Sequence, residues 1–163
     1  MSKTWGKSFP AAILFVGIIA LGIAYYVEFF YGLQPCNLCL YQRVPYGVAM
    51  ALALAMLYKP KMAALIVMTT SVVFFFNAIL ALYHVGVEQH LWVSVSGCQS
   101  QLIEEVNVNV LKELLQQAGQ KTCDSVEWSV FGISMAGYNT IISSILSAVC
   151  FYEFLKVRRA KIG

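Results

Sequence analysis

The segment PCNLCLYQR, residues 35–43, stands between two long apolar runs and contains two cysteines and an arginine. Two thiols three residues apart can close into a disulfide, because one helical turn brings their Cα atoms to within about 6 Å. Arg43 follows Cys39 by four residues, so on a helix it lies on the same face. A permanent cation there favours the Cys39 thiolate over the thiol. The segment therefore predicts a redox centre at a membrane surface.

The composition is that of a membrane protein. Sixty per cent of the 163 residues are hydrophobic and only 12% are charged, which is outside the range of soluble domains. Four segments are long enough for a bilayer, which needs about 20 apolar residues: residues 9–31, 41–58, 62–85 and 130–155. We therefore expect an all-α membrane protein, a four-transmembrane-helix bundle that forms one integral membrane domain over residues 1–163.

The first apolar run is expected to be a retained span and not a signal peptide. It exceeds the roughly 7–15 residues of a signal-peptide core, and no small-residue cleavage site follows it. Glu28, bulky aromatic residues and then the cysteine pair follow instead.

The charged residues are divided unevenly between the two sides of the membrane. One side holds eight of the 11 basic residues and one acid, Glu153; these basic residues are Lys3, Lys7, Lys59, Lys61, Lys156, Arg158, Arg159 and Lys161. The other side holds three basic residues against most of the acids: Glu28, Glu88, Glu104, Glu105, Glu113, Asp124 and Glu127. The positive-inside rule then predicts that both termini are cytoplasmic and that the cysteine loops face outward.

The outer loop, about residues 86–129, is too long to be only a connection. Within residues 101–118, apolar and polar positions recur with helical periodicity, and Gly119 follows as a C′ residue. We expect a short amphipathic helix that lies in the membrane interface. Packing against other outer-loop residues is a weaker alternative, because little else in the loop could cover the apolar side of this helix.

Four of the five cysteines fall on the outer side, where disulfides persist: Cys36, Cys39, Cys98 and Cys123. They allow three pairings; the short spacing favours Cys36 with Cys39, which leaves Cys98 with Cys123. A static structural staple is one interpretation of the second pair. A zinc site completed by a histidine is another, but the second pair lacks Cys-x-x-Cys spacing, so no metal is predicted. Cys150, near the inner end of the last span, is expected to be a buried apolar residue.

Two thiol pairs on one face suggest disulfide exchange between the pairs, which passes two electrons onward through a mixed disulfide. Without a haem or flavin motif, these electrons need a lipid-soluble acceptor, and a quinone takes two. Arg43 could both favour the Cys39 thiolate and bind a quinone oxygen. The structural alternative is an interfacial anchor, but ionisable residues at membrane depth are functional by default.

These features together closely resemble the DsbB family. The resemblance rests on P-C-x-x-C-x-x-x-R at residues 35–43 after a first span, an outer pair at Cys98 and Cys123, and four spans with both ends inside. The segment CDSVEW at residues 123–128, which runs into FGISM at 131–135, also looks like the family's entry into its last span. The family consists of bacterial inner-membrane quinone reductases that reoxidise the periplasmic thiol oxidase DsbA.

The resemblance implies roles for individual residues. Cys98 would form the mixed disulfide with reduced DsbA-like partner, and Cys123 would be its mate. Electrons would then pass to the Cys36–Cys39 disulfide, where Cys36 exchanges with the outer pair and Cys39 engages ubiquinone or menaquinone. Arg43 and His84 would bind the quinone, although a purely structural interfacial histidine is nearly as good an interpretation of His84.

Three other functions are compatible with parts of the pattern. A DsbI-type paralogue that serves one dedicated thioredoxin-like partner would have the same spans and cysteines. A non-enzymatic membrane protein could use two disulfides only to brace its outer loop. Electron flow in the outward direction would need a cytoplasmic thiol relay, and Cys150 has no mate on that side.

Overall fold

The computed structural model describes residues 8–32, 35–92, 123 and 129–162, with side chains as far as residue 159. The long helices in these residues are α1 (Ser8–Tyr31), α2 (Asn37–Tyr58), α3 (Ala63–Glu88) and α5 (Met135–Ile162). Each of them is long and apolar enough to cross a membrane. The predicted fold class, an all-α membrane protein with four spans, is therefore confirmed; the amphipathic helix expected at residues 101–118 lies outside the described residues.

The helix α2 begins earlier than the sequence suggested, at Asn37 and not at residue 41. Cys36 is the N-cap residue, and its sulfur accepts a hydrogen bond from the backbone N–H of Cys39 at 3.3 Å. This contact satisfies one of the N–H groups that a helix start leaves unpaired. The Cys-x-x-Cys segment is consequently the first turn of a membrane helix.

The helix α3 runs to Glu88, beyond the expected end at residue 85, and its end is closed by two backbone hydrogen bonds. His90 donates to the Val87 carbonyl at 3.0 Å, and Leu91 donates to the Gly86 carbonyl at 2.9 Å. This is a Schellman motif, and His90 occupies its left-handed position with φ 56°. His90 is therefore a helix terminator here.

The last helix begins at Met135 and not at residue 130, because a small β-hairpin precedes it. Strands β1 (Ser129–Val130) and β2 (Ile133–Ser134) pair antiparallel. The two turn residues between them, Phe131 and Gly132, have φ values of 52° and 78°, as a two-residue hairpin turn of type I′ requires. Ser134 then accepts a hydrogen bond from the Gly137 N–H at 3.1 Å and starts α5.

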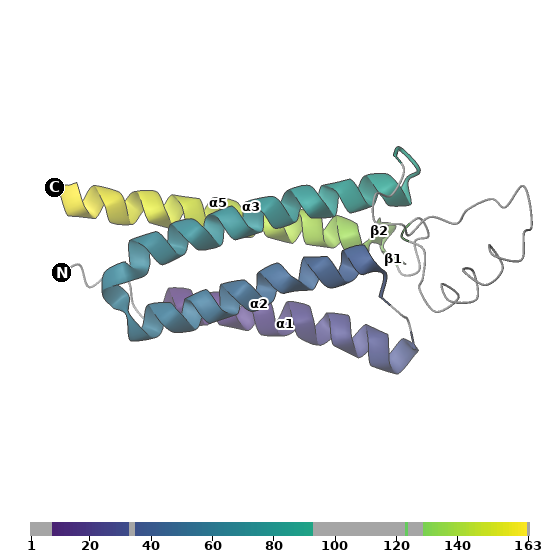
Figure 1. Ribbon diagram of the computed structural model, residues 1–163, viewed down its shortest axis with the longest axis horizontal. Coiled ribbons are helices and arrows are strands. Elements are labelled where there is room, and N and C mark those ends of the chain that lie inside the picture. Colours follow the sequence, from purple (N-terminus) through teal and green to yellow (C-terminus); the bar gives the residue numbers. More distant parts are fainter. Residues whose placement is uncertain (1–7, 33–34, 93–122, 124–128, 163) are drawn as a thin grey trace, which may run out of the picture.

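The helices form a bundle in which α3 packs along α5, α1 along α2, and α2 along α3 (Figure 1). The start of α1, the end of α5 and the 3-10 turn η1 (Pro60–Met62) lie at one end. The start of α2, the end of α3 and the hairpin lie at the opposite end. The cysteine segment therefore sits at the end of the bundle away from the described basic residues of η1 and α5.

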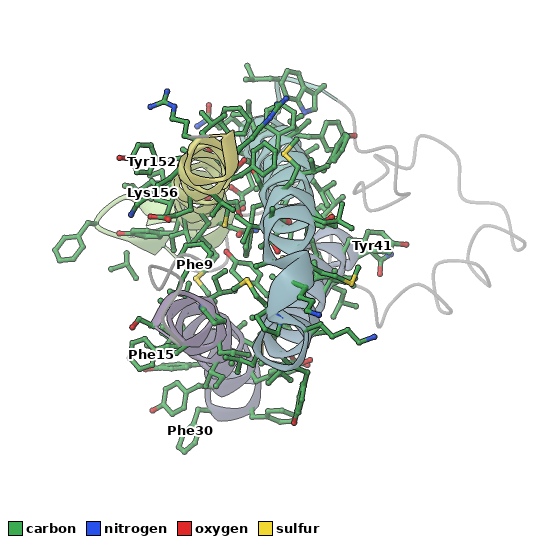
Figure 2. All side chains as sticks on the ribbon, turned by 90° about the vertical axis from the view of Figure 1, so that its left-hand side faces the viewer. Phe9, Phe15, Phe30, Tyr41, Tyr152 and Lys156 are labelled. Atoms are coloured by element: carbon green, nitrogen blue, oxygen red, sulfur yellow. The ribbon has the colours of Figure 1, made fainter. Side chains whose placement is uncertain are left out.

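The outer surface of the bundle is apolar, and polar groups lie between the helices. Phe15, Phe30 and Tyr152 project away from the bundle (Figure 2), and Phe30 is 76% exposed. Between α3 and α5, Ser71 and Ser147 each donate to the other's carbonyl oxygen, at 2.9 and 3.0 Å. Lipid tails accommodate such a surface, and polar side chains between spans satisfy each other.

A substitution at Gly86 is expected to destabilise the outer end of α3. A Cβ there would clash with the ring of Trp92, which stacks on Tyr83 and donates to the Tyr83 carbonyl at 2.9 Å. We expect Gly86→Ala to lower the unfolding free energy by about 1–3 kcal/mol, as overpacking does, measured by thermal unfolding in detergent. Gly22→Ala is the matched control, because a Cβ at Gly22 meets nothing within 4 Å; equal melting temperatures for the two variants would contradict the clash.

Candidate functional site

The two cysteines of the first turn of α2 are in contact with each other in their thiol form. Their Sγ atoms lie 3.0 Å apart, and the Cys36 thiol donates to the Cys39 sulfur. Cys36 is buried, with 8% of its surface exposed, and Cys39 is half-buried. The pair can therefore close into a disulfide with little backbone movement, and reopening it returns the hydrogen bond.

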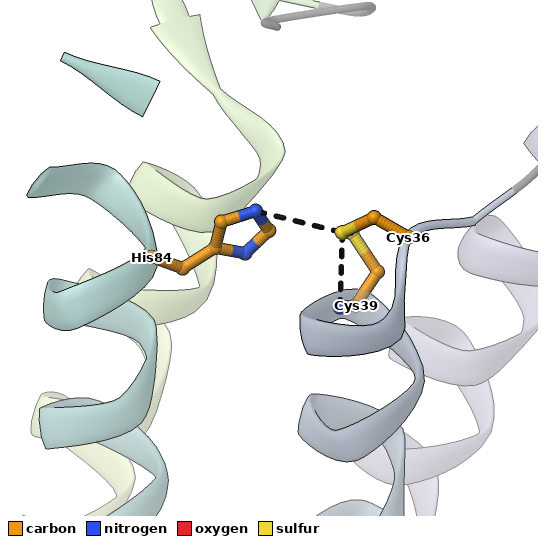
Figure 3. A group of neighbouring side chains, drawn as sticks. All are labelled: Cys36, Cys39 and His84. Carbon is orange, nitrogen blue, oxygen red and sulfur yellow. Dashed lines mark hydrogen bonds between the residues drawn. The ribbon is translucent and has the colours of Figure 1, made fainter. Parts of the chain in front are cut away.

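His84, from the last turns of α3, faces this pair across the bundle (Figure 3). Its Nε2 lies 3.6 Å from Cys36 Sγ, and the side chain is only 3% exposed. Sequence alone placed His84 near the outer end of a span; the structure places it against Cys36. The ligand atoms of Cys36, Cys39 and His84 all lie within 4.8 Å of one another, a spacing that could also hold a thiophilic metal ion.

Cys123 lies against the same pair. It is fully buried and belongs to a cluster of buried residues with Cys36, Leu38 and Val87, against which Cys39 also packs. One member of the predicted outer pair is thus brought to the Cys-x-x-Cys segment from 80 or more positions along the chain. Cys98, its expected mate, lies outside the described residues.

Arg43 reaches toward α1. Its Nη1 donates to Glu28 Oε2 at 2.6 Å, and its guanidinium lies 4.7 Å from the centre of the Tyr25 ring. The Arg43 side chain is 15% exposed, so this ion pair is mostly removed from solvent. From the sequence Glu28 was expected only to be an outer-side charge, and its ion pair with Arg43 was not predicted. That the Arg43 charge favours the Cys39 thiolate stays a prediction. The negative charge of Glu28 offsets part of the positive charge on which this effect depends.

Polar residues that belong to no motif predicted from the sequence complete the surroundings of His84. Gln42 Nε2 lies 3.0 Å from His84 Nδ1, and Asn139 Nδ2 donates to Gln42 Oε1 at 2.6 Å. Glu88 Oε1 lies 3.9 Å from His84 Nε2, and Glu88 Oε2 accepts from the Ser134 hydroxyl at 2.5 Å. Two signals were present in the sequence: Glu88 follows His84 by one helical turn, and Gln42 and Asn139 are amides within apolar spans.

Cys150 has no part in this site. It is 1% exposed and belongs to the main apolar cluster of the bundle with residues such as Met56, Val67 and Phe74. It therefore packs as the small buried apolar residue that the sequence predicted.

The reactivity of Cys36 should depend on Cys39. The hydrogen bond that Cys36 donates to Cys39, together with burial, raises the pKa of Cys36 from its ordinary 9.0 to about 12. Between pH 9 and pH 12 the folded dithiol form thus keeps the Cys36 proton, while the unfolded chain loses it. The contribution of Cys36 to the free energy of unfolding is therefore full below pH 9 and falls as the pH rises toward 12. Cys39→Ala removes the largest cause. We expect Cys36 in this variant to react with iodoacetamide at pH 9 at least about tenfold faster than in the wild type.

Mass spectrometry of the Cys36 peptide after short labelling times measures these rates. The unfolded protein provides the intrinsic rate of the same thiol. Equal Cys36 rates in the folded wild type and in folded Cys39→Ala would show that the hydrogen bond does not hold the proton.

Comparison with known proteins gives a consistent match over almost the whole chain. Residues 6–152 match the family model described as disulfide bond formation protein DsbB. A disulfide bond formation protein B of Acinetobacter baylyi is 28% identical over 163 residues, covering 93% of each chain. One of Xanthomonas euvesicatoria pv. vesicatoria is 29% identical over 171 residues, covering 95% of each chain. An uncharacterized protein of Rickettsia prowazekii is 25% identical, covering 91% of this chain and 85% of its own.

Proposed function

Because the chain belongs to the DsbB family of membrane disulfide bond formation proteins, we propose that it is a disulfide-forming protein-dithiol:quinone oxidoreductase of the bacterial inner membrane. It would reoxidise a periplasmic DsbA-like, thioredoxin-fold thiol oxidase and pass the electrons to ubiquinone or menaquinone. Both termini would be cytoplasmic, since the end of α5 and η1 carry the described basic residues of one side, and the cysteine segments would be periplasmic.

The observation that carries this proposal is the burial of Cys123 in one cluster with Cys36, beside Cys39. Exchange between two disulfide pairs needs an attacking sulfur to reach a sulfur of the second pair. A disulfide that only braced a loop would have no need to lie against a second thiol pair. The position of Cys123 therefore supports a relay of electrons more than a static staple.

The relay balances as two dithiol–disulfide exchanges followed by one transfer of two electrons from a dithiol to a quinone. The partner dithiol reduces the Cys98–Cys123 disulfide through a mixed disulfide at Cys98, and the partner leaves oxidised. The outer dithiol then reduces the Cys36–Cys39 disulfide through Cys36. Finally the Cys36–Cys39 dithiol gives two electrons and two protons to a quinone, and the disulfide and a quinol result.

The residues near Cys39 suit a quinone substrate, which has polar oxygens and an apolar tail. The guanidinium of Arg43 is a donor of hydrogen bonds at the outer boundary of α2, beside the Tyr25 ring. The neighbouring surface of α1 is aromatic and exposed, with Tyr26 and Phe29. Arg43 would bind a quinone oxygen. His84, which lies beside Cys36, would contribute to quinone binding from the other side of the cysteine pair.

The test is steady-state turnover of the purified, detergent-solubilised protein with a reduced DsbA-like oxidase and a soluble quinone analogue. We expect the quinone absorbance to fall only when protein, reduced partner and quinone are all present. Comparing ubiquinone and menaquinone analogues assigns the acceptor. If the four outer cysteines form static disulfides that resist glutathione-range reductants, and no quinone is reduced, the proposal is wrong.

A further inference from the structure

A continuous line of hydrogen bonds between buried and half-buried side chains leads from near the start of α5 to the cysteine pair. It begins at Asn139 of α5, passes through Gln42 of α2 at 2.6 Å, and reaches His84 of α3 at 3.0 Å. His84 in turn lies 3.6 Å from Cys36 Sγ. Gln42 is 6% and His84 3% exposed, so three helices contribute to one polar path inside an apolar bundle.

The direction of this line is set at Asn139. Three donors converge on Asn139 Oδ1: the Tyr46 hydroxyl at 2.7 Å, the Ser143 hydroxyl at 3.1 Å and the Asn77 amide at 3.4 Å. The Asn139 amide nitrogen is therefore left to donate to Gln42 Oε1. The Gln42 amide nitrogen must then be the atom that faces His84 Nδ1.

The alternative is to exchange the oxygen and nitrogen positions in the amides of Gln42, Asn139 and Asn77 together. This arrangement would be less favourable. The Tyr46 hydroxyl would lose the oxygen to which it donates. Asn77 Oδ1, which is buried without a hydrogen-bond partner among the described residues, would be replaced by an unpaired NH₂ group. A buried N–H without an acceptor is rarer in proteins than a buried carbonyl without a donor, so the drawn direction is the stable one.

We infer that Gln42, oriented by Asn139, is a positioning residue that fixes His84 as the tautomer with its proton on Nε2. With Nδ1 accepting from Gln42, the neutral ring carries its hydrogen on the nitrogen that faces Cys36 Sγ. His84 then donates toward Cys36, and the Cys36 thiol donates to Cys39. Every donor in the line points toward Cys39 Sγ, so the path stabilises negative charge on that sulfur.

This inference rests on the proposed function for its meaning, because Cys39 is the sulfur assigned to the quinone. It also has a consequence for the metal-like spacing of Cys36, Cys39 and His84. A metal ion would need the lone pair of Nε2, and the Gln42 donor at Nδ1 places a proton there instead. The line of hydrogen bonds therefore favours thiol chemistry over metal binding at this cluster.

The tautomer can be read directly from long-range ¹H–¹⁵N correlation spectra of ¹⁵N-histidine-labelled protein in micelles, above pH 8 and without quinone. The chain has two histidines, so a His90→Gln variant assigns both signals. We expect the His84 proton on Nε2 in the wild type. In Gln42→Glu, a carboxylate can only accept from Nδ1–H, and the proton should move to Nδ1. A wild-type proton on Nδ1, or no change in Gln42→Glu, overturns the inference.

The effect on Cys39 is measured by the rate at which iodoacetamide labels Cys39 of the reduced protein at pH 7. We expect labelling to slow about tenfold in Gln42→Glu and in Gln42→Met, since either variant loses the donor that orients His84. Gln42→Met has no charge, so it separates the hydrogen bond from the repulsion that Glu would add. Unchanged labelling in Gln42→Met overturns the role assigned to Gln42.

Ser71→Ala is the matched control, because it removes a buried hydrogen bond between α3 and α5 that is not part of this line. Its melting temperature should fall as in Gln42→Met, while its Cys39 labelling and its His84 tautomer stay those of the wild type. Neither readout uses quinone, so failure of quinone reduction would reject the proposed function and leave this test intact.

Discussion

Cys39→Ser is expected to abolish dithiol-dependent quinone reduction, and Cys36→Ser is expected to do the same. With a serine in place of either cysteine, the pair can no longer give two electrons to the acceptor by closing into a disulfide, so no slower version of the same route remains. The loss should appear in kcat for the purified variants under the turnover conditions given above. Binding of the DsbA-like partner should persist, because Cys98, and not this pair, is assigned to the mixed disulfide.

Cys150→Ala is the matched control for this loss. Cys150 is also a buried cysteine of a membrane helix, but it packs in the apolar cluster far from the pair. Its variant should keep wild-type turnover with a lower melting temperature. Full turnover by Cys39→Ser would remove this pair from the electron route.

Arg43→Ala is expected to raise the apparent KM for quinone by about ten- to a hundredfold with a smaller effect on kcat. The substitution removes a charged hydrogen-bond donor for a quinone oxygen, and such hydrogen bonds contribute about 1.5–3 kcal/mol. Steady-state titration of the quinone at saturating partner measures the change. An unchanged KM would argue against Arg43 as a quinone ligand.

The ion pair of Arg43 with Glu28 supplies the matched control for that experiment. Glu28→Gln removes the carboxylate but leaves the guanidinium above Tyr25. If Arg43 acts directly on the quinone, Glu28→Gln should keep a KM near that of the wild type. If the Arg43→Ala defect instead came from leaving the Glu28 carboxylate unpaired, the double variant Arg43→Ala/Glu28→Gln would recover the wild-type KM for quinone.

Much of the fold follows from hydropathy, because each span needs only length and a lack of charge. The observed α1 (Ser8–Tyr31) lies close to the expected residues 9–31. The boundaries that differ are those set by local hydrogen bonds. Because Cys36 caps it, α2 begins at Asn37 and not at residue 41. Because the hairpin turn at Phe131 and Gly132 precedes it, α5 begins at Met135 and not at residue 130.

The contents of the site were only partly accessible from sequence. Spacing identified the Cys36–Cys39 pair, the predicted topology placed Cys123 on the same side of the membrane, and the resemblance to the DsbB family pointed to His84. The contacts of Gln42 with His84 and Asn139 join residues 42 and 97 positions apart. A span that faces lipid on one side is apolar nearly all round, so its sequence does not reveal how the helix is rotated toward its neighbours.

The most direct test of the electron route is a single turnover without the partner. Protein with all outer cysteines reduced, freed of reductant under anaerobic conditions, is mixed with excess quinone. Quinol is measured by absorbance and the Cys36–Cys39 disulfide by mass spectrometry. We predict one quinol for each Cys36–Cys39 disulfide formed in the first turnover. A disulfide that forms without quinol, or reduced Cys36 and Cys39 that persist beside excess quinone, would contradict this electron route.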